Sequence, residues 1–476
     1  MAKRPNIVLF LTDDHAEWAL GCYGNRAVRS PNLDELAAGG VKFANAFTPS
    51  PVCSPARACV FTGLTPSQIG IHDWLQERLE EIGHHDWLAG ERTLAEFLDE
   101  AGYYCGLSGK WHIGQSHLRP RGFSWHFGLP GWQGIHIAEC EYVHNGRPLT
   151  LNGNKTQFIT DYALQFLDTA PPERPFFLNV GYISTHSPYD NQEPELVAQY
   201  NHVTPETISM RERHPWTHNE GFPKDEKWDR AGVAKRWRNY YAAVSDIDRN
   251  AGRIAKRLAE IGELDNTLFI YTSDHGLALG QRGFFGKGNG TRPLNMYETS
   301  IRIPLIMRFP AGFASGAVVE RCVDHYDTFR TILDVAGIDL QRAAVSGRRY
   351  PGRSYVELAR GNAIPDWSDT RVGEYGDLRM IRTPSHKLVR RYPNGPDELF
   401  DLASDAFETQ NLADRPDCAA TKAKLQYELD AFYKQYEVPE RSGLRVKSLR
   451  QHNGTPGSSS EAWRDGGRER LGLQVY

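Results

Sequence analysis

The sequence has no long apolar run, which excludes a membrane-spanning segment. Crossing a bilayer takes roughly 20 consecutive apolar residues, whereas the first apolar run, NIVLFLT at 6–12, ends in acids. A secretion signal would need a longer apolar stretch and a small-residue cleavage site. As written, the sequence therefore predicts a cytoplasmic protein, or a periplasmic or secreted one if a signal has been removed.

Cysteine is scarce, and neither sign of charge is in excess. The seven cysteines are scattered and odd in number, which does not indicate a disulfide framework. The net charge is −4, from 55 Lys and Arg against 59 Asp and Glu. A surface for nucleic acid or anionic lipid would need a clear excess of positive charge. We therefore expect neither nucleic acid nor a membrane as a partner.

Buried-strand patterns alternate with helical patterns along most of the chain. Apolar runs at 6–12, 174–186 and 266–276 are typical of strands covered on both faces. Within 233–261, apolar residues recur at steps of three and four, which predicts a long amphipathic helix. This alternation predicts an α/β fold in which helices flank a doubly wound mixed sheet.

The pattern changes near Gly361, so we predict three parts. Residues 1–360 would form the catalytic α/β domain. Residues 361–437 contain short alternating segments and then an amphipathic helix, which indicates a smaller α+β subdomain with an antiparallel sheet. Residues 438–476 are polar and are interpreted as a loosely ordered tail or as an arm in a homo-oligomer.

Polar residues follow the predicted buried strands. In an open α/β sheet, ligands bind outside the carboxyl ends of the strands, so these side chains should meet at one edge. An acid after a strand is also typical of a turn or a helix cap. Three carboxylates and an imidazole around one ion would favour Ca²⁺, Mg²⁺ or Mn²⁺. The candidate ligands are Asp13, Asp14, Asp274 and His275, and the same edge would carry Lys110, His112 and His186.

The stretch PVCSPARACVFTG, at 51–63, places Cys53 at the predicted start of a helix. Pro55 suits the first helical turn, where its missing N–H costs little. A helix N-terminus lowers the pKa of a thiol, and Arg57 lies one turn on, where it could hold an anion. The residues alone leave two interpretations open, a reactive thiol and a buried structural cysteine.

Cys53-Ser-Pro-Ala-Arg57 resembles the C-x-P-x-R signature of the type I sulfatases, a formylglycine-dependent family of the alkaline-phosphatase-like superfamily. Other stretches resemble further landmarks of the family in the same order. They cover most of residues 5 to 435, which makes the resemblance specific. The matching stretches are NIVLFLTDD, GKWHIG at 109–114, THSP at 185–188, SDHG at 273–276, the loop with Lys287, and DELFDLASDAFETQNLAD at 397–414.

The resemblance implies a modified residue and a metal. A formylglycine-generating maturation enzyme would oxidise Cys53 to Cα-formylglycine, whose hydrate serves as the nucleophile. One divalent metal is implied, with Ca²⁺ first and Mg²⁺ or Mn²⁺ as alternatives. Its implied ligands are Asp13, Asp14, residue 53, Asp274 and His275.

The resemblance also implies a sulfatase mechanism. Arg57, Lys110 and Lys287 would bind the sulfuryl oxygens of a sulfated carbohydrate or similar small ester. His186 would protonate the leaving oxygen. His112 would take the proton that accompanies release of sulfate.

One position departs from many members of the family. His275 stands where many sulfatases have Asn, although some sulfatases and the related phosphonate monoester hydrolases share this histidine. The pair Asp13–Asp14 favours a sulfatase, because those relatives usually lack the second acid. A phosphonate monoester or phosphodiester hydrolase is therefore the alternative. A more remote one is an inactive relative that binds sulfated glycans.

Aromatic and polar residues outside the signatures suggest a substrate pocket. Trp74 or Trp132 could stack on a sugar, while His72 and Asp73 hydrogen-bond to it. Arg379 lies where the smaller subdomain could overhang the pocket. The tryptophans could equally be core or oligomer contacts.

Overall fold

The computed structural model describes residues 4–131, 136–217, 229–343 and 347–453. Its main sheet has a parallel centre in which β1 (Asn6–Thr12) lies between β7 (Phe176–Gly181) and β8 (Thr267–Ser273). β3 (Tyr104–Gly109) continues the parallel part beyond β7. The carboxyl ends of these four strands therefore point to the same edge of the sheet.

Both parallel and antiparallel pairs lie beyond this centre, which confirms the predicted mixed sheet. Within the described residues the sheet has 11 strands, in the order β11-β2-β12-β8-β1-β7-β3-β4-β5-β6, with β13 beside β2. β12 runs antiparallel to β2 and to β8, and β5 runs antiparallel to β4 and to β6. The flanking strands are β2 (Val41–Phe47), β4 (Trp125–Gly128), β5 (Ile137–His144), β6 (Arg147–Asn154), β11 (Arg302–Ile303), β12 (Leu305–Arg308) and β13 (Ala317–Asp324).

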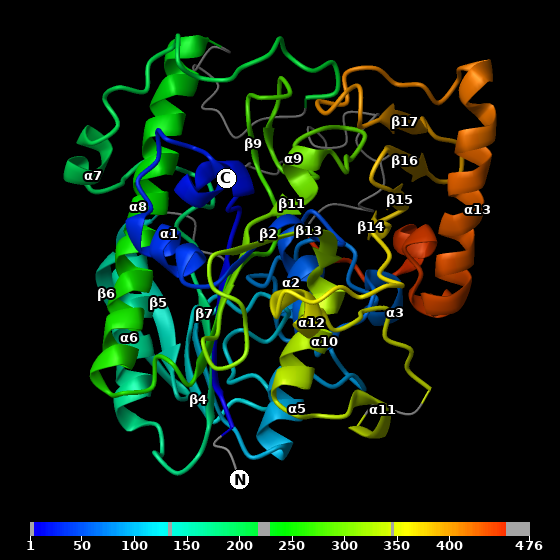
Figure 1. Cartoon of the computed structure of the whole chain (residues 1–476). Helices are drawn as coiled ribbons and strands as arrows, with labels where there is room; N and C mark the ends of the chain where they lie inside the picture. The colour runs from blue at the N-terminus through cyan, green and yellow to red at the C-terminus, as the bar shows by residue number, and fades with distance from the viewer. Residues whose placement is uncertain (1–3, 132–135, 218–228, 344–346, 454–476) are drawn as a thin grey trace.

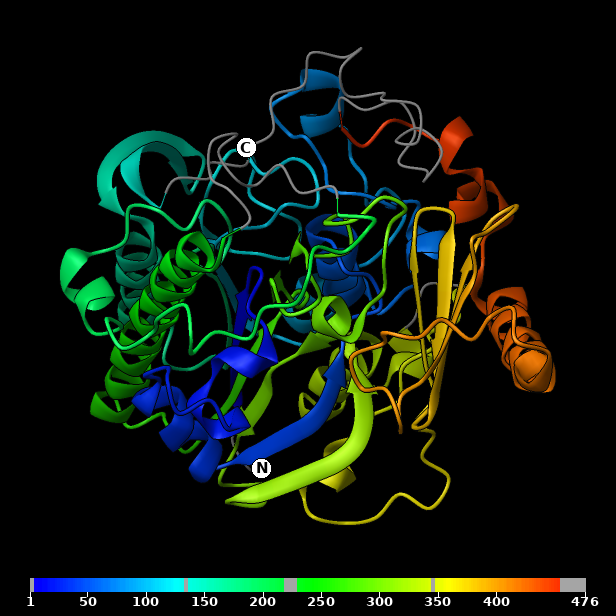
Figure 2. The ribbon, with the colours of Figure 1, turned by 90° about the horizontal axis from the view of Figure 1, so that it is seen from above.

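Helices cover both faces of the sheet (Figures 1 and 2). Along β1, Val8 and Phe10 pack into one apolar core, whereas Ile7, Leu9 and Leu11 pack into the other. The doubly wound arrangement is thus confirmed. The first core includes α1 (Pro31–Ala38), α6 (Lys155–Thr169), α7 (Pro194–Ala198) and α8 (Arg230–Glu260), and the second includes α2 (Cys53–Thr62), α5 (Leu94–Glu100), α10 (His325–Val335) and α12 (Val356–Ala359).

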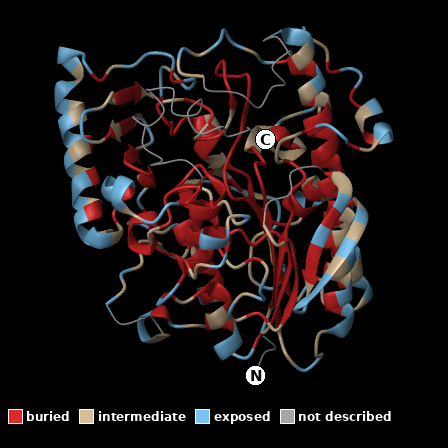
Figure 3. Ribbon diagram, turned by 180° about the vertical axis from the view of Figure 1, so that it is seen from behind, coloured by how far each residue is buried: buried red, intermediate tan, exposed pale blue. Residues whose placement is uncertain are grey.

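The long predicted helix is α8, and its apolar stripe lies against the sheet. Val244, Ile247, Ala251, Ile254 and Leu258 are all fully buried. Burial is concentrated between the helical layers, and the outer faces of the helices are exposed (Figure 3). None of the helices in the described ranges is long and apolar enough to cross a membrane. The short helices are α3 (Pro66–Ile69), α4 (Glu80–Gly83), α9 (Glu298–Ile301) and α11 (Leu340–Ala343).

A second, smaller sheet lies beside the main one, as the sequence predicts. Its order is β14-β15-β16-β17, and all neighbours are antiparallel. α13 (Ala419–Tyr436) packs on its outer face (Figure 2), with Leu425, Leu429 and Tyr433 buried. The four strands are β14 (Arg371–Tyr375), β15 (Leu378–Arg382), β16 (His386–Arg391) and β17 (Glu398–Asp401). The limits of the three predicted parts of the chain remain predictions.

The described part of the predicted tail, 438–453, packs on its own chain. It contains two short 3₁₀ segments, η4 (Pro439–Arg441) and η5 (Gly443–Ser448). His452 accepts a hydrogen bond from the amide of His72 over 2.9 Å and is buried. This segment therefore covers the loop that follows α3. The rest of the predicted tail lies outside the described residues.

Candidate active site

Short segments that follow the central strands converge on the first residue of α2, Cys53. Asp13 and Asp14 come after β1, and Lys287 comes from the loop after the two-residue strands β9 (Ala278–Leu279) and β10 (Phe285–Gly286). The remaining segments follow β3, β7 and β8, and they carry Lys110, His112, His186, Asp274 and His275. As expected from the sequence, these side chains meet at one edge of the sheet.

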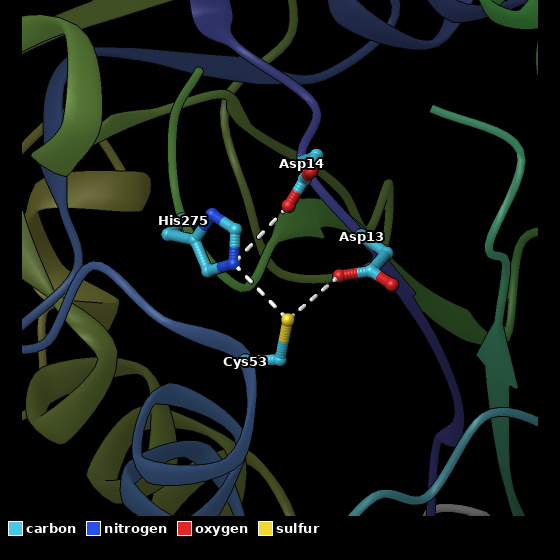
Figure 4. Close-up of side chains that lie close together, drawn as sticks. All are labelled: Asp13, Asp14, Cys53 and His275. Carbon is cyan, nitrogen blue, oxygen red and sulfur yellow. Dashed lines mark hydrogen bonds and ion pairs between the residues drawn. The ribbon is translucent and has the colours of Figure 1, made fainter. Parts of the chain in front are cut away.

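Four side chains form a compact group, here called the Cys53 cluster: Asp13, Asp14, Cys53 and His275 (Figure 4). One ligand atom from each lies within 4.8 Å of the others, and all four residues are buried. The Cys53 sulfur is 3.3 Å from Asp13 Oδ1 and 3.5 Å from His275 Nε2. His275 Nε2 is in turn 3.3 Å from Asp14 Oδ1. Two carboxylates, an imidazole and a ligand from residue 53 are a donor set that fits a divalent metal.

Asp274, the fifth expected ligand, lies beside this cluster. Its Oδ1 accepts hydrogen bonds from the amides of His275, at 2.9 Å, and Asp14, at 3.3 Å. Its Oδ2 is 2.9 Å from Nε of Arg57. Asp274 thus joins the backbone of the cluster to the arginine of α2.

Arg57 is fully buried, and within the described residues it donates hydrogen bonds to one carboxylate and to backbone carbonyl oxygens. Besides Asp274, it donates to the carbonyl oxygen of Lys110 at 3.1 Å and to those of Leu11 and Thr12 at 3.5 and 3.4 Å. These contacts tie the end of β1 to the segments after β3 and β8. The sequence suggested an anion-holding role, and the contacts add a positioning role beneath the cluster.

Two buried ammonium groups reach the Cys53 cluster. Lys110 pairs with the carboxylate of Asp13. Lys287 Nζ donates to Asp14 Oδ1 at 2.6 Å and to the Cys53 sulfur at 3.0 Å. Burial alone would lower the pKa of Lys287, but Asp14 and Cys53 raise it well above its ordinary value. The site therefore holds permanent positive charge around residue 53.

This charge changes the ionisation of the acidic groups. Burial alone would raise the pKa of the Cys53 thiol, but Lys110 and Lys287 bring it well below its ordinary value. Burial and Cys53 oppose ionisation of Asp13 too, but Lys110, His186 and Lys287 outweigh them, so the pKa of Asp13 is lowered. The unmodified site thus stabilises an anion at residue 53, as a site for a negatively charged substrate should.

The two remaining histidines present their rings differently. His112 Nε2 donates to the carbonyl of Leu75 at 2.8 Å, so Nδ1 is the acceptor nitrogen of the neutral ring. This Nδ1 is buried and has no partner at hydrogen-bond geometry in the described ranges, although His112 helps to lower the pKa of the Cys53 thiol. His186 Nδ1 donates to the carbonyl of Ser187 at 2.6 Å. Burial would lower the pKa of His186, but Asp14, Asp13 and Cys53 together outweigh it, so the pKa is raised.

The pocket residues suggested by sequence have contacts of their own. His72 Nε2 donates to the carbonyl of Arg441 at 2.7 Å. The buried carboxylate of Asp73 accepts from Tyr375 at 2.6 Å and from Asn453 at 3.1 Å. The C-terminal segment and β14 thus satisfy polar groups that were expected to face a sugar.

The other three suggested residues differ in position. Trp74 is half-buried against an apolar cluster that the main domain and the C-terminal sheet form together. Arg379 pairs with Glu437 at 2.6 Å and lies 3.7 Å from the centre of the Tyr433 ring, so it holds the end of α13. Trp132 lies outside the described residues. The structure does not bring Arg379 to the Cys53 cluster, and substrate contact by these residues remains a prediction.

Sequence reasoning missed the residues that fix the backbone of the cluster. Tyr240, on α8, donates to the carbonyl of Asp14 at 2.8 Å, and His325, on α10, donates to that of Asp274 at 3.0 Å. Asp14 needs such support because its φ of 58° lies in the left-handed region. No local pattern distinguishes these two residues from other buried aromatic positions on their helices.

Comparisons with known proteins agree with this geometry. A family model described as sulfatase matches residues 5–338, and one described as the C-terminal part of N-sulphoglucosamine sulphohydrolase matches 280–435. An N-acetylglucosamine-6-O-sulfatase of Bacteroides thetaiotaomicron is 27% identical, over 91% of this chain and 87% of the relative.

Two solved structures show the same fold along nearly the whole chain. One is a complex with its substrate D-glucosamine-2-N,6-O-disulfate, with a TM-score of 0.77 and 25% identity over 91% of this chain and 98% of the other. The other is a phosphonate monoester hydrolase of Agrobacterium radiobacter, with a TM-score of 0.73 and 22% identity over 91% and 96%. At 22% identity, the second likeness concerns the fold alone.

Proposed function

This chain belongs to the sulfatase family and is a sulfuric ester hydrolase, and from that premise we propose that its substrate is a sulfated sugar. The observation that carries the proposal is the Cys53 cluster with its two lysines, which would hold a sulfate monoester against residue 53. The relative from B. thetaiotaomicron and the solved substrate complex both concern sulfated amino sugars, which supports a carbohydrate as the substrate class.

The site needs two additions to work, and its residues fit both. We propose that a maturation enzyme converts Cys53 to Cα-formylglycine and that a divalent metal, Ca²⁺ before Mg²⁺ or Mn²⁺, binds beside it. The metal makes a bound hydroxyl more acidic and offsets negative charge, and the hydrated aldehyde supplies the nucleophile. The residues proposed to hold the metal are Asp13, Asp14, residue 53, Asp274 and His275.

The chain's own side chains would do the rest. Lys110 and Lys287 would bind the sulfuryl oxygens and stabilise the negative charge as it moves during the reaction. Arg57 would keep Asp274 in place, because its guanidinium is bound to that carboxylate. His186, whose pKa is raised, is suited to give a proton to the leaving oxygen. His112 is suited to accept one at Nδ1.

Two measurements test this function together. Intact mass of the peptide around Cys53 reports whether the thiol has become an aldehyde, and turnover is then measured on that same protein with 4-nitrophenyl sulfate and monosulfated hexoses. The proposal expects turnover of both only when the aldehyde is present. Turnover by protein with an unmodified thiol, or none by modified, metal-loaded protein, would contradict it.

A phosphonate monoester hydrolase is the second candidate, and His275 is the residue that favours it. The test compares kcat/KM for 4-nitrophenyl sulfate with that for 4-nitrophenyl phenylphosphonate on fully modified protein. The pair Asp13–Asp14 leads us to expect a preference for the sulfate ester. A preference for the phosphonate would make the second candidate the function.

A further inference from the structure

A small cavity adjoins the site and brings in a residue with no role so far, Glu77. The cavity has about 10 Å³ for the centre of a water-sized group, so it takes one such group. Lys110 and His112 form part of its wall, which puts it next to the Cys53 cluster. Its lining residues are Glu77, Lys110, Trp111, His112, Ser116, Leu129, Gly131 and Ile183.

The carboxylate of Glu77 is only half satisfied. Its Oε1 accepts a hydrogen bond from the amide of Gly114 over 2.7 Å. Its Oε2 is buried and has no hydrogen-bond partner in the described ranges. Leaving a buried acceptor without a donor costs about 1–3 kcal/mol, and more for a charged group. An arrangement of this kind is explained when a ligand or water supplies the missing donor.

Size and charge restrict what that donor can be. A cavity for one water-sized group admits a hydroxyl, whereas an acetamido or sulfate group has several heavy atoms more. A carboxylate also attracts a hydrogen-bond donor and repels a second anion. Because Lys110 and His112 share the cavity wall, a substrate group placed there would lie close to the sulfate ester bound at the cluster.

We propose that Glu77 is a specificity-determining residue, which accepts a hydrogen bond from a free hydroxyl of the substrate near its sulfate ester. The same carboxylate would disfavour a substrate that carries a second sulfate at that position. This inference rests on the proposed function, since it names the substitution pattern of the sulfated sugar.

The test uses Glu77→Gln in the modified, metal-loaded enzyme. The glutamine oxygen can keep the bond from Gly114, while its NH₂ replaces the unpaired acceptor Oε2 with a donor. Substrates are the best monosulfated hexose, its deoxy analogues at each hydroxyl, and 4-nitrophenyl sulfate. Because a hydrogen bond to a charged group is involved, we expect kcat/KM to fall ~10- to 100-fold on the hexose and less than about threefold on the aryl sulfate.

For the wild type, kcat/KM on one deoxy analogue should be as low as kcat/KM of the variant on the hexose. The variant should have the same kcat/KM on that analogue and on the hexose. Glu80→Gln, at a side chain that is 86% exposed, is the control. An equal loss on the hexose and the aryl sulfate would overturn the proposal, because Glu77 would then only position Gly114. If the wild type turned over aryl sulfate but no hexose, the sugar substrate itself would be refuted, and Glu77's role with it.

Discussion

Among the buried charge clusters of the described residues, the Cys53 cluster and a second one differ in how their charges are paired. The second, here called the junction cluster, consists of Glu298, Arg382, Lys387 and Glu408, and it joins the main sheet to the C-terminal sheet. Lys387 Nζ lies 3.1 Å from Glu298 Oε1 and also pairs with Glu408. Arg382 Nη2 lies 3.1 Å from Glu298 Oε2. Arg302 lies 3.7 Å from Glu298 Oε2 and Arg282 lies 3.9 Å from Glu408 Oε2, so each buried carboxylate is paired with more than one cation.

In the Cys53 cluster Lys110 pairs with Asp13 and Lys287 with Asp14, but both cations also act on one further atom. Lys287 lies 3.0 Å from the Cys53 sulfur, and Lys110 acts on the same thiol. His112 keeps a buried Nδ1 without a hydrogen bond from the described residues. Mutual compensation is what a structural role requires. Charges that converge on a single position, with acceptors left over, indicate a place for substrate chemistry. Mutations should separate the two clusters accordingly, one in activity and the other in stability.

The largest effect should come from Cys53→Ala. Without a side chain that can become the nucleophile, we expect kcat/KM on 4-nitrophenyl sulfate to fall by at least ~10³-fold. The free energy of unfolding of the modified protein should change little, because the hydrated aldehyde is uncharged and the substitution removes no buried charge. Turnover and urea unfolding measure the two quantities. Cys22→Ala, at a half-buried cysteine, is the control. Activity within tenfold of the wild type would refute the role of residue 53.

His186→Ala should give the next largest effect, and that effect should depend on the leaving group. A general acid contributes typically ~10²–10⁴-fold, and most where the leaving oxygen is a poor one. We therefore expect kcat of the variant to fall ~10²–10⁴-fold on an alkyl sugar sulfate and by less on 4-nitrophenyl sulfate. His84→Ala, at a 59% exposed imidazole, is the control. Equal losses on both substrates would mean that His186 does not protonate the leaving group.

Lys387→Met should affect stability rather than chemistry. It leaves Glu298 and Glu408 without their shared cation in a fully buried place. Breaking a buried ion pair on one side costs about 3–5 kcal/mol in unfolding free energy, which urea unfolding measures. The kcat of the folded fraction should stay the same. Lys424→Met, at a 76% exposed side chain, should change stability by about 0.5 kcal/mol or less. Lost kcat with unchanged stability would reverse the assignment of the two clusters.

The same contrast explains how far the sequence could predict the molecule. Strand and helix periods predicted the mixed, doubly wound sheet, since apolar patterning is a local signal. Three members of the Cys53 cluster were predictable from position, because Asp13 and Asp14 follow the buried strand β1 and His275 follows the buried strand β8. The hydrogen bond of Arg57 to Asp274 was not predictable, because the two residues are 217 positions apart and the orientation of their side chains depends on packing.

The junction cluster carries no local signal at all. Lys387 sits on a strand of the small sheet, Glu298 begins a four-residue helix, and Glu408 lies in a loop. In the sequence, each of these residues resembles an ordinary surface charge, because only the packing of the two sheets buries it. His72 and Asp73 show the reverse, because they suggested a substrate pocket while His452 and Asn453, far along the chain, contact that loop in the fold.

The pH dependence of stability gives the finest test of the junction cluster, through Glu298→Gln. Burial alone would raise the pKa of Glu298, but Lys387 and Arg382 bring it down to about 2, from 4.5 in the unfolded chain. A depressed carboxyl pKa stabilises the fold above the unfolded pKa, and this contribution disappears as pH falls through the folded one. The wild type should thus exceed the variant by about 3 kcal/mol near pH 6, and the gap should close between pH 4.5 and about 2. The raised pKa of Glu408, which arises mainly from burial, is present in both proteins and largely cancels in the difference.

Urea unfolding at several pH values measures the gap, with Glu428→Gln, at a 37% exposed side chain, as the control. A gap that stays constant from pH 6 to 2.5 would mean that Glu298 contributes through packing, because only an ionised carboxylate loses its partners on protonation.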